Sequence, residues 1–267
     1  MAALVLGWWD GQDGPTIMRT LGIDLAASPA NTAGCLIDWT ERTAVLLERP
    51  VDDEAIVRTA GTVELTGIDV PFGWPDAFVA AVAAHHAGRG WPPVDTDPPA
   101  DRVPLRFRVT DLDLMSRGDR PLSVSTERIG VAAMRGARIL ALLSQEGLPI
   151  DRSGTSGSVA EVYPAGALRA WGLPSSGYKG ARHRAICAAL ASGFAAACGP
   201  MADVVASCVD GADDDELDAV VCAVIGAAVL LGGTRRPAAA QLAAARREGW
   251  IHVPSWGPAE IAARATS

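Results

Sequence analysis

Gly22-Ile23-Asp24 and Gly67-Ile68-Asp69 are two copies of one tripeptide, and each copy closes a short apolar stretch and precedes small or turn-forming residues. Successive side chains of a strand point to opposite faces, so each aspartate shares a face with the glycine two residues before it. In parallel, adjacent strands the two carboxylates would lie about 5 Å apart. Because such anions repel each other, the pair predicts a shared proton or a divalent cation.

The segments around the two copies predict a mixed sheet. Short turns separate strands predicted over 20–26, 32–39 and 43–48, which indicates an antiparallel meander. A helix predicted over 54–60 then leads to a fourth strand over 63–70. Because a helix separates the meander from this strand, we expect a parallel crossover beside the first strand.

A long insertion, at about 85–150, follows the fourth strand. Its part over 88–128 is rich in Pro, Asp and Arg and has little periodicity, and such insertions are more often functional than not. Residues 159–163 predict a fifth strand, and helices dominate from there to Leu231. Individual helices are predicted over 75–86, 129–145 and 165–171.

Composition favours one domain in a reducing, cytoplasmic setting. The chain has 267 residues, 49% of them hydrophobic, and we expect 18–267 to form a single domain. Its five cysteines form no Cys-x-x-Cys pair, so burial as small hydrophobic side chains is expected rather than zinc or disulfides. No apolar run is long enough to span a membrane. Residues 1–17 carry no strand or helix pattern, and we expect a disordered or mis-started extension with Met18 as the natural start.

The net charge of -8 counts against an extended nucleic-acid interface, because phosphate binding normally needs a basic face. A local basic groove made by arginines stays open as an alternative. Because that alternative stays open, the partners that we consider are nucleic acid or another phosphorylated ligand.

An acidic run, Asp213-Asp214-Asp215-Glu216-Leu217-Asp218, opens an Ala- and Val-rich segment that is predicted to be helical. Helix capping and the helix dipole explain the first three aspartates. Asp218 lies beyond the cap among apolar residues, so we expect it to face a partner, water or a metal. Asp215 shares a helical face with Asp218, although capping explains Asp215 equally well.

The order of these elements resembles the RNase H-like fold, which implies a five-stranded sheet of order 3-2-1-4-5 with carboxylates on strands one and four and on the last helix. Asp24, Asp69 and the Asp215/Asp218 pair occupy those positions. Asp215-x-x-Asp218-Ala is also distantly similar to the terminal helix of RuvC-type resolvases. The chain further resembles a group of predicted nucleases with this fold, domain of unknown function 429. The matching motifs are Gly22-Ile23-Asp24, Ile68-Asp69-Val70-Pro71-Phe72-Gly73, Arg108-Val109-Thr110-Asp111, Glu161-Val162-Tyr163-Pro164, Leu217-Asp218-Ala219 and Glu248-Gly249-Trp250-Ile251-x-x-Pro254.

The resemblance implies a carboxylate site that binds Mg²⁺ or Mn²⁺ through Asp24, Asp69 and Asp218. Hard cations of this kind prefer oxygen ligands and activate water toward a phosphodiester. We therefore expect a metal-dependent phosphodiester hydrolase, a nuclease, with Asp215 and Glu161 as further catalytic candidates. An exposed strand glutamate paired with an arginine is the alternative for Glu161.

Three residues are candidates for substrate binding. Arg108 and Asp111 lie in the insertion, where an arginine can clamp a phosphate or carboxylate. An Arg-Asp pair that holds the loop together explains them equally well. Lys179, the only lysine of the chain, is suited to meet a phosphate, although most single lysines are solvated.

Two other functions remain open at this stage. Gly22-Ile23-Asp24-Leu25-Ala26-Ala27-Ser28 also resembles the first phosphate loop of actin- and sugar-kinase-type phosphotransferases, although no convincing second loop follows. The third hypothesis is a non-catalytic binding module that keeps its carboxylates for structure or for ligand recognition, and the acidic net charge and the lack of a basic stripe in the sequence favour it.

Overall fold

A mixed sheet forms the centre of the protein in a computed structural model that describes residues 18–89, 91 and 102–267. Among these residues the strand order is β3-β2-β1-β4-β5-β6, which confirms the predicted order of the first five strands and adds a sixth. The strands are β1 (Arg19–Asp24), β2 (Ala33–Asp38), β3 (Thr43–Leu46), β4 (Leu65–Asp69), β5 (Val159–Val162) and β6 (Ile251–His252).

The sheet has the predicted meander and crossover. β1, β2 and β3 pair antiparallel, and β4 returns parallel to β1 after helix α1 (Asp53–Ala60). In the β1–β4 register, Gly22 lies opposite Gly67 and Asp24 lies opposite Asp69. The two tripeptides are therefore aligned side by side, as the repeat predicts.

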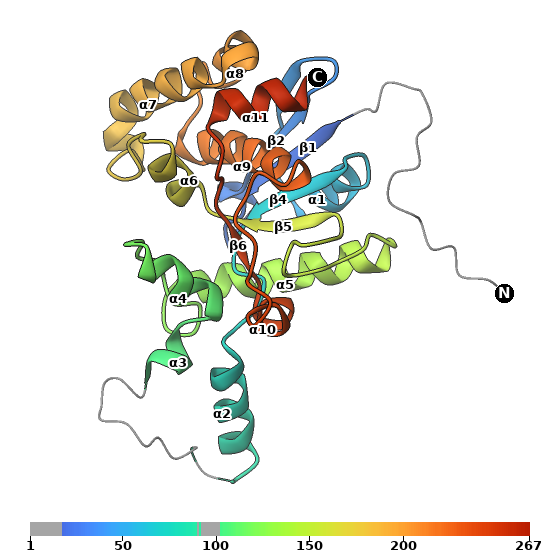
Figure 1. Cartoon of the computed structure of the whole chain (residues 1–267), viewed down its shortest axis with the longest axis vertical. Coiled ribbons are helices and arrows are strands. Elements are labelled where there is room, and N and C mark those ends of the chain that lie inside the picture. Colours follow the sequence, from blue (N-terminus) through green and yellow to red (C-terminus); the bar gives the residue numbers. More distant parts are fainter. Residues whose placement is uncertain (1–17, 90, 92–101) are drawn as a thin grey trace, which may run out of the picture.

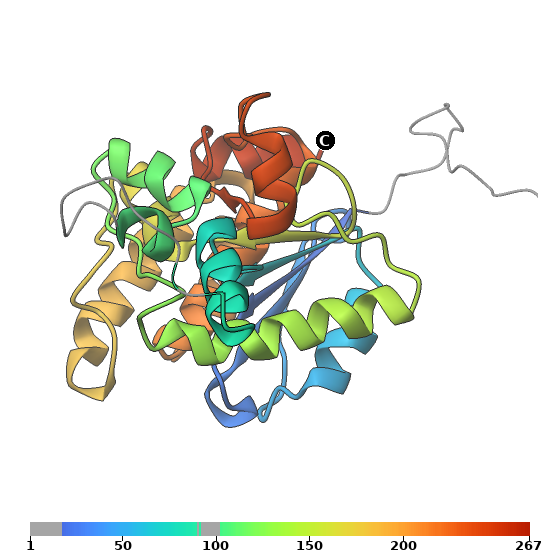
Figure 2. The ribbon, with the colours of Figure 1, turned by 90° about the horizontal axis from the view of Figure 1, so that it is seen from below.

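Helices cover both faces of the sheet (Figures 1 and 2). α1 and α5 contribute to one apolar core, and α7, α8, α9 and α11 contribute to the core of the other face. The bounds are α2 (Asp76–His86), α3 (Val103–Arg106), α4 (Val109–Ser116), α5 (Ile129–Gln145), α6 (Pro164–Ala170), α7 (Arg184–Ala197), α8 (Ala202–Cys208), α9 (Asp214–Leu230), α10 (Leu242–Glu248) and α11 (Pro258–Ala265).

The glycines of the two tripeptides allow α9 to pack closely on the sheet. A Cβ atom at Gly22 would collide with the carbonyl oxygen of Ala219 and the backbone of Ala223, and one at Gly67 would lie 2.8 Å from the carbonyl oxygen of Cys222. Side chains alternate along β1, so Asp24 leaves the sheet on the same face as Gly22. The glycines thus bring the acidic start of α9 against the strand ends that carry Asp24 and Asp69.

Several sequence-based expectations need adjustment. The prediction missed β6, because two residues are too short to show an alternating pattern. The insertion is not irregular throughout its described part, since α3 and α4 form there. All five cysteines except Cys208 are buried, which agrees with the expected role as small hydrophobic side chains. Within the described ranges, the longest apolar helices are too short to cross a bilayer. The expectation for 1–17 falls outside the described residues.

Candidate functional site

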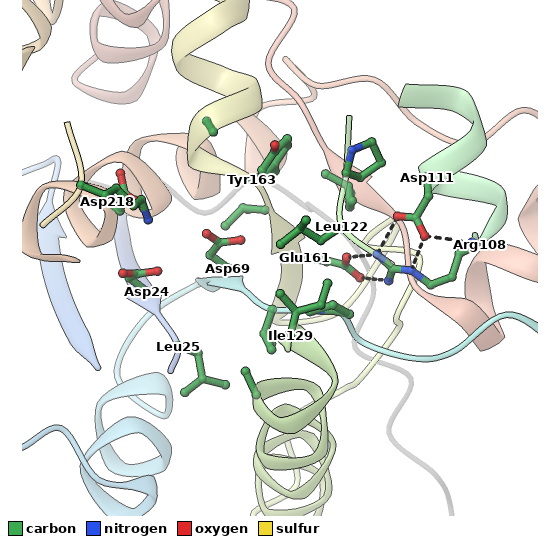
Figure 3. A pocket seen from close by; sticks show the side chains of 18 residues that line it. Asp24, Leu25, Asp69, Arg108, Asp111, Leu122, Ile129, Glu161, Tyr163 and Asp218 are labelled. Atoms are coloured by element: carbon green, nitrogen blue, oxygen red, sulfur yellow. Dashed lines mark hydrogen bonds and ion pairs between the residues drawn. The ribbon is translucent and has the colours of Figure 1, made fainter. Parts of the chain in front are cut away.

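A cavity of about 400 Å³ opens where β1 and β4 end (Figure 3). Its polar wall contains five of the predicted site carboxylates, Arg108 and Lys179. Its other walls are largely apolar and come from strand ends, α5, α6 and the insertion. The lining residues are Asp24, Leu25, Asp69, Val70, Pro71, Arg108, Asp111, Pro121, Leu122, Ile129, Ala132, Glu161, Val162, Tyr163, Ala165, Lys179, Asp218 and Ile251.

Asp24 and Asp69 form a half-buried pair of carboxylates at the floor of this cavity. Within the described part of the chain, neither side chain accepts a hydrogen bond or forms an ion pair shorter than 4 Å. Burial, opposed by Lys179 and reinforced by Asp218 and Glu161, raises the pKa of Asp69 to about 7. Burial also raises the pKa of Asp24 well above its ordinary value, with Lys179 opposing and Asp69 adding. The pair therefore lacks a counter-charge of its own.

Asp218 completes the acidic side of the cavity from the first turns of α9, and its carboxylate is buried. The Tyr178 hydroxyl donates a hydrogen bond of 2.8 Å to its Oδ1 atom, and Lys179 Nζ lies 2.5 Å from its Oδ2 atom. Burial raises the pKa of Asp218, and Lys179 and Tyr178 oppose that shift. Asp218 is thus a partnered anion, as its position beyond the helix cap predicts.

Lys179 places one positive charge among three carboxylates. Burial lowers its pKa, but Asp218, Asp24 and Asp69 raise it above the ordinary value, so the ammonium stays charged. Its side chain is 52% exposed and lines the cavity. Lys179 therefore serves as an internal counter-ion and still faces the cavity.

The start of α9 is fixed by a capping box and by Arg49. The Asp213 side chain accepts a hydrogen bond from the Glu216 backbone N–H, and the Glu216 side chain accepts one from the Asp213 N–H. Arg49 donates two hydrogen bonds to Asp213 and lies 3.8 Å from Asp215. Asp215 does not line the cavity, and the structure places it in this capping network. Its catalytic role stays a prediction.

Arg108 lies at the centre of a buried ionic cluster on the opposite side of the cavity (Figure 3). Its guanidinium donates to both carboxylate oxygens of Asp111, to both of Glu161 and to the backbone carbonyl of Glu248. Glu161 also accepts a hydrogen bond of 2.9 Å from the Phe72 backbone N–H. This arrangement supports the loop-holding alternative for Arg108 and Asp111. The substrate-binding and catalytic roles considered for these residues stay predictions.

The donor set fits a hard cation that is held by two carboxylates. In the described ranges, no three Asp, Glu, His or Cys side chains are arranged as a metal-binding group, so the trio of Asp24, Asp69 and Asp218 is not preassembled. The physical reason is that the Lys179 ammonium lies next to Asp218 and occupies the place of a cation there. Mg²⁺, however, is often held by one or two carboxylates together with waters and a substrate phosphate. Asp24 and Asp69 match that pattern.

Sequence reasoning missed the apolar wall and one anchoring glutamate. Leu122 and Ile129 line the cavity from the insertion. The stretch around Leu122 has too little periodicity to indicate a surface, and the helix predicted from Ile129 onward does not show which of its residues meet a cavity. Glu248 accepts hydrogen bonds of 2.7 Å from the backbone N–H groups of Asp76 and Val109, at the starts of α2 and α4. The sequence around Glu248 matched a motif, but no local signal indicated its distant partners.

Comparisons with known proteins give a family and no activity. The family described as protein of unknown function (DUF429) matches residues 22–242. No curated protein matches the chain. No solved structure matches it either. Because the family description specifies no reaction, the resemblance to nucleases and to RuvC-type resolvases gains no support from it.

Proposed function

Since the chain belongs to the family described as protein of unknown function (DUF429), we propose its function from the cavity itself. We propose a divalent-metal-dependent phosphodiester hydrolase that has an RNase H-like fold and uses Mg²⁺ or Mn²⁺. The sheet order and the placement of carboxylates on β1, β4 and α9 support the fold assignment. The reaction is inferred from the chemistry of the side chains.

One observation carries this proposal: Asp24 and Asp69 are aligned on adjacent parallel strands and face a cavity without a donor of their own in the described part of the chain. Two adjacent like charges that are half-buried cost free energy unless a proton or a cation compensates them. Lys179 contacts Asp218 and so compensates only part of the charge. Two oxygen ligands that face a cavity favour a hard divalent cation as the compensating charge.

The residues around the pair have separable roles. When bound, the cation would neutralise charge on a phosphoryl oxygen and lower the pKa of a coordinated water. Asp24 and Asp69 hold and orient it. Asp218, buried and bonded to Tyr178, keeps Lys179 in place, and the ammonium would attract a second phosphoryl oxygen.

Metal-dependent hydrolysis of bis(4-nitrophenyl) phosphate tests this proposal. We expect turnover with Mg²⁺ or Mn²⁺ that chelation abolishes and that Asp24→Asn reduces by about a hundredfold or more. Asp76→Asn is the matched control, because Asp76 lies outside the cavity and pairs with Arg247 at the surface. Equal turnover by wild type and Asp24→Asn would contradict the proposal.

A further inference from the structure

We propose that the cavity accepts a small phosphodiester with a flat or apolar group, of the size of a mono- or dinucleotide, rather than a nucleic-acid strand. This inference rests on the proposed function and specifies its substrate class. Three features of the site carry it: the composition of the walls, the use of the nearby cations, and the way the insertion is fixed.

The cavity has charged side chains at two sides and apolar side chains along its other walls. Asp24 and Asp69 lie at one side, the cluster of Arg108, Asp111 and Glu161 lies at the other, and Leu25, Leu122 and Ile129 also line the space (Figure 3). A volume of about 400 Å³ lies within the range of pockets that enclose small ligands. A reacting phosphate at the carboxylate end would thus have its substituent against apolar side chains, which suits an aromatic ring or a nucleobase.

The basic side chains that line the cavity are already paired with acidic groups of the protein. Among the described residues, Arg108 and Lys179 are the basic side chains that line it. The Arg108 guanidinium donates its hydrogen bonds to Asp111, to Glu161 and to a backbone carbonyl. Lys179 is paired with Asp218.

A nucleic-acid strand needs more positive charge than this site offers. Proteins that hold a strand neutralise several phosphates in succession, usually with a groove of lysines and arginines. Here the net charge is -8, and the Lys179 ammonium, already paired with Asp218, is the positive charge that the described cavity offers besides a metal. This amount of positive charge is enough for one reacting phosphate.

The apolar wall is held firmly in place by its neighbours. Leu122 is 52% exposed at the cavity, whereas Ser123 and Val124, which follow it, are buried. The Ser123 hydroxyl donates a hydrogen bond of 2.8 Å to the carbonyl oxygen of Arg106. The anchored backbone therefore presents a large apolar side chain that contributes little to the core, as a substrate contact requires.

Tyr163 adds an aromatic surface near the reacting end. It lines the same cavity as Asp69. Aromatic side chains that line a pocket commonly stack on flat ligands. Together with Leu122, Tyr163 provides the contacts expected for a ring and not for a charged backbone.

The test compares substrates and two leucine variants. Metal-loaded wild-type protein is assayed on bis(4-nitrophenyl) phosphate, on a dinucleoside monophosphate, and on long single- and double-stranded oligonucleotides. Leu122→Gln keeps the side-chain size and removes the apolar contact. Leu112→Gln is the matched control, because Leu112 is also an exposed leucine of the insertion but does not line the cavity.

We expect kcat/KM per phosphodiester bond to be higher for the small diesters than for the oligonucleotides. Leu122→Gln should raise KM for the small diesters about fivefold and weaken calorimetric binding of 4-nitrophenyl phosphate similarly, without changing Mg²⁺ affinity. Leu112→Gln should leave both quantities unchanged.

Two outcomes overturn the inference and differ in what they leave intact. Preferential cleavage of oligonucleotides, or unchanged KM and product binding in Leu122→Gln, would refute the substrate class but leave the metal-dependent hydrolase standing. Absence of metal-dependent cleavage of every substrate would refute the proposed function, and the inference with it.

Discussion

Replacing Asp69 by asparagine should stabilise the metal-free protein at neutral and alkaline pH. The carboxylate lies next to Asp24 and accepts no hydrogen bond from a described residue, and burial raises its pKa from 3.8 to about 7. A carboxyl whose pKa is raised by folding favours the folded state below its unfolded pKa, and that contribution is lost as pH rises through the folded pKa. Asparagine keeps the shape and removes the charge.

The size of the effect follows from the pKa shift. Each pKa unit corresponds to about 1.4 kcal/mol, so this shift sets a ceiling of about 4 kcal/mol. The side chain is only half-buried, and solvent screening reduces the gain to about 1 to 2 kcal/mol. The difference between variant and wild type should be near zero at about pH 4, should grow towards about pH 7 and should level off above it.

Urea unfolding in the presence of a chelator, followed across this pH range, measures the difference. Asp76→Asn serves as the control, because Asp76 lies in an exposed ion pair and its loss should change the free energy of unfolding by less than about 0.5 kcal/mol at any of these pH values. The reasoning is refuted if Asp69→Asn is as stable as wild type, or less stable, at about pH 8. Addition of Mg²⁺ should stabilise wild type and not the variant.

Three other substitutions test separate parts of the account. Lys179→Gln should tighten Mg²⁺ binding severalfold in calorimetry, because no ammonium then competes for the acidic side of the cavity, and unchanged or weaker binding would count against this. Gly22→Ala should lower the free energy of unfolding by about 3 kcal/mol or more, because the added methyl group collides with the α9 backbone. The control is Gly193→Ala, which should be neutral or stabilising, because a methyl group there has no neighbour closer than 4.0 Å. Arg108→Met should cost about 3 to 5 kcal/mol in chemical denaturation, because it leaves two buried carboxylates without their counter-charge. The control is Arg117→Met, which removes an ion pair nearer the surface and should change stability by less than about 1 kcal/mol. A similar loss of stability in Arg108→Met and Arg117→Met would show that burial of the Arg108 cluster does not matter.

The sequence predicts the alignment of the two aspartates because short-range rules determine it. A period of two residues per strand fixes the face of Asp24 and Asp69, and the intervening helix indicates the parallel pairing. Asp218 is predicted for a similar reason, since an aspartate beyond the helix cap among apolar residues needs a partner. The partner itself, Lys179, lies 39 positions earlier in the chain and has no local signature.

The rest of the site depends on contacts between distant segments. β6 is too short to be recognised, yet it pairs with β5 and helps to form the edge against which α4 packs. Arg108 and Glu161 are 53 residues apart, and their burial follows from how the insertion folds back on the sheet. No propensity or spacing rule indicates in advance that a guanidinium will be enclosed by carboxylates rather than exposed to a ligand.

Titration calorimetry with Mg²⁺ and Mn²⁺ on wild type, Asp69→Asn and Asp76→Asn tests the central claim most directly, because it requires no substrate. We predict binding to wild type and to Asp76→Asn, and its loss in Asp69→Asn. Absence of binding to wild type, or equal binding to wild type and Asp69→Asn, would contradict a metal centre built on the aligned aspartates.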